Sequence, residues 1–93
     1  MADQNSSRPK KAYTVSLRHK LGQYYRREKA EQSSSDRRWL NGFMAAGFHS
    51  SLITLKELKL ENLSAYREAH GRRMSEAEEL YLERRLTKLC EQK

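Results

Sequence analysis

Residues that interrupt regular structure are scarce in this sequence. Its 93 residues include one proline, Pro9, and four widely spaced glycines. Proline and glycine mark the turns between short strands, so their scarcity favours helices over a sheet. We therefore predict an all-α fold.

The sequence contains one cysteine, Cys90, which has no partner within the chain. An unpaired thiol is typical of a reducing compartment, so we expect an intracellular location, in the cytoplasm or at the nucleoid or nucleus. The apolar runs are only a few residues long, whereas a membrane-spanning helix needs about 20 apolar residues. The N-terminus also lacks the apolar segment of a secretory signal. No membrane partner is expected.

Patterns typical of catalysis and metal binding are also missing. His19, His49 and His70 are far apart and far from Cys90, without the spacing of metal ligands. The glycines do not form a phosphate-binding loop, and no nucleophile has a local histidine and carboxylate beside it. These absences predict a non-enzymatic protein without a metal or another cofactor.

Positive charge is abundant and unevenly distributed. The chain carries 19 Lys and Arg against 12 Asp and Glu, a net charge of +7. Residues 1–49 hold ten of the basic and four of the acidic residues, so the N-terminal half alone carries +6. Such a concentration of one sign attracts polyanions.

Apolar spacing predicts four or five short helices in a single helical domain over residues 12–93, preceded by a disordered basic tail over residues 1–11. The first helix is expected from about Val15 to Gln32 and the second from about Asp36 to Ala46, with Gly47 as its left-handed stop. Residues 52–70 fit either one bent helix or two short ones, the second capped by Asn62, and Gly71 ends them. Ser75 and Glu78 form a capping box for a last helix from Glu76 to about Glu91.

The expected core is centred on the second helix, because it holds the only Trp and a Phe at helical spacing. The core residues predicted from this spacing are Trp39, Phe43, Leu55, Leu58, Leu82 and Leu86. The leucine stripe of the last helix is expected to pack in the same core. Alternatively, it binds a second copy of the chain to form a homodimer.

The charge excess predicts a nucleic-acid-binding accessory or regulatory protein that contacts the phosphates of DNA or RNA through its N-terminal arm and first helix. The candidate contact residues are Lys10, Lys11, Arg18, Lys20, Arg26, Arg27, Lys29, Arg37 and Arg38. Tyr24 or Tyr25 either packs in the core or stacks on an exposed base. Arg84 and Arg85 are expected to matter less, because Glu79 and Glu83 lie nearby and offset their charge.

Two alternatives remain open. The basic face would also suit a small adapter or inhibitor that docks on an acidic protein, such as a nucleic-acid-processing enzyme. A helix-turn-helix with Gly47 at its turn is a weaker match, because Phe43 stands where a small residue is needed and Lys56 where an apolar one is needed.

Overall fold

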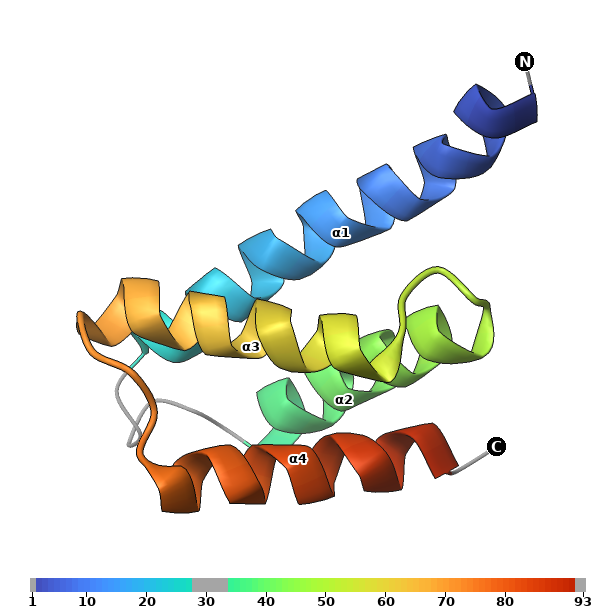
Figure 1. Cartoon of the computed structure of the whole chain (residues 1–93). Helices are drawn as coiled ribbons and strands as arrows, with labels where there is room; N and C mark the ends of the chain where they lie inside the picture. Colours follow the sequence, from blue (N-terminus) through green and yellow to red (C-terminus); the bar gives the residue numbers. More distant parts are fainter. Residues whose placement is uncertain (1, 28–33, 92–93) are drawn as a thin grey trace.

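Four α-helices make up the computed structural model of the protein (Figure 1). The structure describes the backbone of residues 2–27 and 34–91, and the side chains of residues 8–27 and 35–91. The helices are α1 (Ala2–Arg26), α2 (Ser34–His49), α3 (Leu55–His70) and α4 (Glu76–Glu91). No strand occurs within these ranges, so the predicted all-α bundle is confirmed.

Helix α1 begins at Ala2, well before the expected start near Val15, and it includes Pro9. The backbone is therefore helical where a disordered tail was expected. Two contacts N-terminal of Val15 account for part of this extension. The Lys10 ammonium donates to the Leu52 carbonyl at 3.2 Å and to Glu57 Oε1 at 2.8 Å, and Tyr13 is buried in the core.

Helix α2 continues through Gly47 to His49, so the predicted left-handed stop at Gly47 is wrong. Gly47 is small for a packing reason: a Cβ at this position would overlap the ring of Tyr13. Because Gly47 is helical, it does not form the turn of a helix-turn-helix either. The Asn41-Gly42 pair, which would predict a hairpin between two strands, lies inside the same helix, where apolar residues at helical spacing flank it.

Helix α3 is a single helix, which settles the alternative left open for residues 52–70. Thr54 and Glu57 form a reciprocal capping box at its start, and Gly71 ends it with a left-handed φ of 68°. Asn62 does not cap a new helix: it is fully buried in the middle of α3. Its Nδ2 donates to the Leu58 carbonyl at 2.8 Å, and its Oδ1 accepts from the Tyr25 hydroxyl at 2.8 Å.

Helix α4 has the predicted bounds. The Ser75 hydroxyl accepts from the Glu78 backbone N–H at 3.2 Å, and Glu78 Oε1 accepts from the Ser75 N–H at 3.0 Å. These two bonds satisfy donors that the first turn of a helix leaves open.

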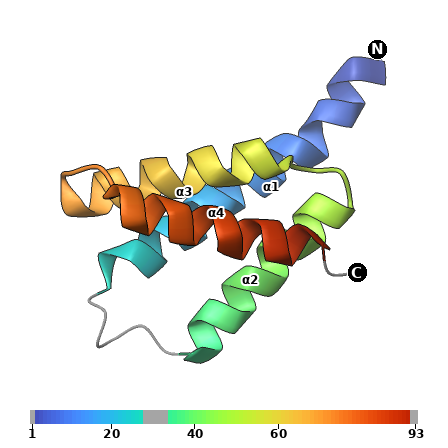
Figure 2. The same cartoon turned by 60° about the horizontal axis from the view of Figure 1, so that its bottom comes forward.

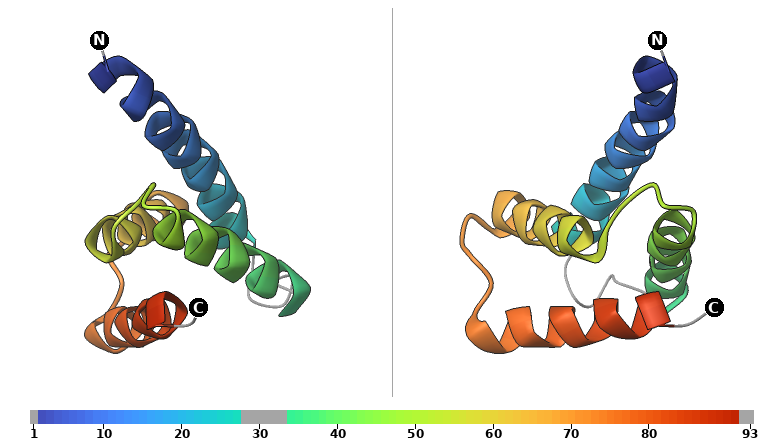
Figure 3. Two further views of the ribbon diagram at one scale, coloured as in Figure 1. Left: turned by 90° about the vertical axis from the view of Figure 1, so that its right-hand side faces the viewer. Right: turned by 45° about the vertical axis from the view of Figure 1, so that its right-hand side comes forward.

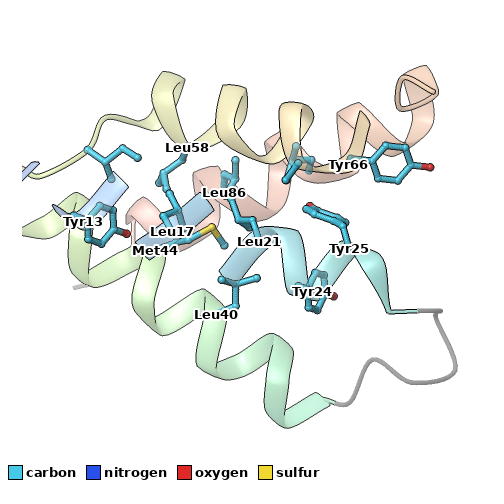
Figure 4. Packing of buried hydrophobic residues seen from close by; sticks show 13 residues of the cluster. Tyr13, Leu17, Leu21, Tyr24, Tyr25, Leu40, Met44, Leu58, Tyr66 and Leu86 are labelled. Carbon is cyan, nitrogen blue, oxygen red and sulfur yellow. The ribbon is translucent and has the colours of Figure 1, made fainter. Parts of the chain in front are cut away.

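Side chains from all four helices form the core, and Figure 4 shows them. Leu58, Leu82 and Leu86 are buried as predicted, while Phe43 and Leu55 are partly buried against the core. The residues buried most completely are Leu17, Leu21, Met44, Leu58, Asn62 and Leu86.

Trp39 is not in the core, and this is the main correction to the prediction. Its residue surface is 57% exposed. Its neighbours Leu40 and Met44 turn inward instead, so the apolar face of α2 is wider than the surface that the other helices cover.

Helices α1 and α3 lie side by side and run in the same direction, while α2 and α4 run the opposite way (Figures 1 and 2). The N-terminal turns of α1 project beyond the other helices (Figure 3). The C-terminal ends of α1 and α3 therefore lie near the N-terminal ends of α2 and α4. Among the described helices, none combines the length and the hydropathy needed to cross a membrane.

Candidate nucleic-acid interface

Residues at these four helix ends line a groove of about 910 Å³. The helix ends themselves lie at the left of Figure 1. We call this groove the end groove. All four helices contribute to it, together with the segment between α3 and α4. Its walls are formed by Tyr24, Tyr25, Arg27, Arg37, Tyr66, His70, Arg72, Met74, Ala77, Glu78, Tyr81, Leu82 and Arg85.

The end groove is strongly basic, with four arginines and one carboxylate in its walls. Arg85 donates two hydrogen bonds, at 2.8 and 3.1 Å, to the neutral Oδ1 of Asn41. The pKa of Arg37 is raised above its usual value, mainly by a hydrogen bond with Tyr24. Both guanidinium groups therefore lie beside neutral partners. Their positive charge is available to an anion in the groove.

The one carboxylate of the end groove, Glu78, is held by the α4 capping box. The Ser75 N–H and the Tyr66 hydroxyl both donate to Glu78, the latter at 2.7 Å. These bonds, the backbone one first, lower the pKa of Glu78 to about 2. Glu78 also pairs with Arg72 at 3.3 Å. It therefore acts as a fixed internal counter-ion for one of the four arginines.

Aromatic rings line the same groove. Tyr25 and Tyr66 pack edge to face with centroids 5.7 Å apart, and both are buried. Figure 4 shows them with Tyr24 at one end of the core. The centroids of the His70 imidazole and the Tyr66 ring are 4.3 Å apart. Tyr81, by contrast, is 61% exposed at the groove wall.

A smaller cavity of about 170 Å³ lies between α1 and α2 and shares Tyr24 and Arg27 with the end groove. Trp39 lines it, and the Lys20 ammonium is 4.9 Å from the centroid of the Trp39 ring. Arg27 and Asp36 form an ion pair there. The two cavities together form one surface, on which cationic groups and rings adjoin one another. We call this surface the cation–ring tract; its outward members are Lys20, Arg27, Arg37, Trp39, Arg72, Tyr81 and Arg85.

The sequence-predicted contact residues are divided by the fold. Lys10 and Arg18 face α3, where Lys10 pairs with Glu57 and Arg18 makes a bidentate pair with Glu61 at 2.9 and 3.0 Å. The first helix contains few acids, but some of its basic side chains are still paired, because α3 supplies carboxylates. Lysine and arginine residues paired in this way join α1 to α3.

Three of the predicted residues, Lys20, Arg27 and Arg37, come together in the cation–ring tract. Lys11, Arg26 and Arg38 are exposed but do not line it. Lys29 lies outside the described residues. Tyr24 and Tyr25 are buried, which agrees with their packing in the core.

The tract also includes four residues that are not among the predicted contact residues: Arg72, Arg85, Trp39 and Tyr81. Glu79 and Glu83 pair with Lys59 of α3, at 3.4 and 2.6 Å, whereas Arg85 donates to Asn41. No local signal marks these residues, since only the packing of the helices brings them near α1. The exposure of Trp39 could have been found only from knowing which part of the α2 face is covered.

The leucine stripe of α4 serves the core through Leu82 and Leu86. A groove of about 860 Å³ separates α3 from α4 on another face, with Leu80 and the exposed residues Arg84 and Lys88 in its walls. A homodimer through α4 stays a prediction.

Within the described ranges, no three His, Cys, Asp or Glu residues lie close enough to hold a metal ion. Comparison with known protein families, curated proteins and solved structures finds no match to this chain. What the tract binds is therefore inferred from its chemistry.

Proposed function

We propose that this protein is a non-enzymatic nucleic-acid-binding accessory protein that holds phosphates on the cation–ring tract. The observation that carries the proposal is the placing of cations beside aromatic rings along one continuous surface, with the Lys20 ammonium 4.9 Å from the Trp39 ring. Nucleic acid offers phosphates to the cations and bases to the rings, so both parts of the surface find a partner in one ligand.

The charge of the tract supports the same function. The Lys20 ammonium lies against the Trp39 and Phe43 rings, Arg37 is hydrogen-bonded with a tyrosine hydroxyl, and Arg85 donates to an amide oxygen. A cation beside a neutral group keeps its attraction for an external anion, whereas Lys10 and Arg18 already have carboxylate partners. The exposed Lys11 and Arg26 of α1 would add diffuse attraction.

The test is equilibrium binding of a labelled 12-nucleotide DNA or RNA strand and of the matching duplex at several salt concentrations. If Lys20, Arg37 and Arg85 each contact one phosphate, log Kobs should fall against log salt concentration with a slope of about −2 for the single strand. Exposed Lys11 and Arg26 would steepen this slope.

Absence of salt-dependent binding to DNA and to RNA would refute the proposal. The partner would then be an acidic protein surface, to which the same cations are complementary.

A further inference from the structure

Two aromatic rings on the cation–ring tract are largely exposed to solvent. Trp39 is 57% exposed and Tyr81 is 61% exposed. Exposed apolar side chains are common singly. These two, however, lie on cavities that share Tyr24 and Arg27, so they belong to one surface.

Packing holds the Trp39 ring in a defined orientation. It is nearly parallel to Phe43, with centroids 5.7 Å apart and 9° between the planes. Phe43 is in turn nearly parallel to the buried Tyr13, at 4.7 Å and 11°. A ring supported in this way loses little conformational freedom when a flat ligand stacks on it.

Stacked rings distinguish between the forms of nucleic acid. In a duplex, each base face is covered by the neighbouring base pair, so a protein ring reaches a face only where a base is unstacked. Proteins that bind single strands therefore combine a cationic groove with exposed aromatic side chains. A duplex needs the cations alone.

We infer that the cation–ring tract binds single-stranded nucleic acid in preference to duplex, with bases stacked on Trp39 and Tyr81 and phosphates held by Lys20, Arg37 and Arg85. This inference rests on the proposed function and adds the form of the ligand. The rings give affinity for any base, because every base has a π-face, and the cations hold the backbone between them.

Trp39 is the only tryptophan of the chain, so intrinsic fluorescence above tyrosine emission reports on this one ring. The experiment titrates the full-length protein with an unlabelled 12-nucleotide single strand and with its duplex at one salt concentration. The single strand should quench Trp39 and bind more tightly than the duplex.

Two ring-removing variants, Trp39→Leu and Tyr81→Leu, are measured with labelled strands. Each should weaken single-strand binding by about 5- to 150-fold, the range for one stacked base, and leave the salt slope and duplex binding unchanged. Leu60→Ala is the matched control, because Leu60 is also exposed but does not line the tract; it should bind as the parent does. Thermal melting followed by circular dichroism checks that each variant is folded.

The inference fails if the duplex binds as tightly as the single strand, if Trp39 is not quenched, or if both ring variants bind like Leu60→Ala. In each case salt-dependent binding would persist and the proposed function would stand. If the parent shows no salt-dependent binding to either form, the proposed function itself fails.

Discussion

Replacing Gly47 by alanine tests the close packing of α1 on α2. The new Cβ would overlap the Tyr13 ring at Cζ, at the hydroxyl and at Cε2; even Cε2 would be 2.6 Å away, against about 3.5–4.0 Å for carbon atoms in contact. The Tyr13 ring is buried and stacks on Phe43, and the Tyr13 hydroxyl donates a hydrogen bond to the Phe43 carbonyl at 2.8 Å. It has to move to admit the methyl group.

The magnitude follows from three contributions. Overpacking of this kind costs about 1–3 kcal/mol, and losing the Tyr13 hydrogen bond costs about 1 kcal/mol. The higher helix propensity of alanine offsets about 1 kcal/mol of this. Gly47→Ala should therefore lower the free energy of unfolding by about 1–3 kcal/mol, measured by urea denaturation followed by circular dichroism.

Tyr13→Leu provides the second arm of a double-mutant cycle, because leucine lacks the two ring carbons and the hydroxyl oxygen that the Cβ would meet. In the Tyr13→Leu background, Gly47→Ala should be neutral or stabilising by up to about 1 kcal/mol, through helix propensity alone. If Gly47→Ala stabilised the parent, or if the two changes were additive, the direct packing of Tyr13 on Gly47 would be refuted.

Three further changes test other parts of the fold by denaturation or melting. Trp39→Ala should lower the free energy of unfolding by only about 1 kcal/mol, the value of an exposed ring contact with a cation–π pair. A decrease of more than about 3 kcal/mol would place Trp39 in the core after all. Asn62→Ala should cost more, about 1–3 kcal/mol, because it removes the acceptor of the buried Tyr25 hydroxyl, and an unchanged urea midpoint would contradict this bond. The pKa of Glu78, about 2 in the folded protein against its usual 4.5, lies below the unfolded value, so its stabilisation is present above about pH 4.5 and is lost as the pH falls toward 2. Glu78→Gln should therefore melt below the parent at pH 7, and the two should converge near pH 2; an equal gap at both pH values would show that the charge contributes nothing.

Local signals in the sequence mark the start of both C-terminal helices and the end of α3, although they leave open whether residues 52–70 form one helix or two. The start of α4 follows from the Ser75 capping box and from acids in its first turn. The start of α3 follows from the Thr54 capping box, and its end from Gly71. Each of these signals acts within one helical turn, so it does not depend on how the helices pack.

Errors arose where another helix decides the role of a residue. Gly47 was assigned to a helix end because glycine commonly ends helices, but here it makes room for Tyr13, which is more than 30 residues earlier in the chain. Trp39 was placed in the core because it lies on the apolar face of α2, but α1 and α4 cover only the part of that face that carries Leu40 and Met44.

The candidate site was only partly predictable for the same reason. Net charge located the basic half of the chain, and Lys20, Arg27 and Arg37 do line the tract. Arg18 pairs with Glu61 of α3, and Arg85 of α4 lines the tract; both depend on which helices are neighbours. Local spacing carries no information on either.

The most direct test of phosphate binding by the cation–ring tract compares two double variants that change the net charge equally. Lys20→Gln with Arg37→Gln removes two cations of the tract, while Arg84→Gln with Lys88→Gln removes two exposed cations of the α3–α4 groove. Arg37, Arg84 and Lys88 are exposed, and such charges add little to stability. Lys20 is partly buried against the Trp39 and Phe43 rings, and cation–π contacts of this kind contribute about 0.5–1 kcal/mol. Both variants should therefore stay folded. The measurement is the salt dependence of single-strand binding. The tract variant should have a log–log slope shallower by about 1.4, the value for two lost phosphate contacts, and the control should match the parent. Equal slopes in the two variants would contradict binding at this tract.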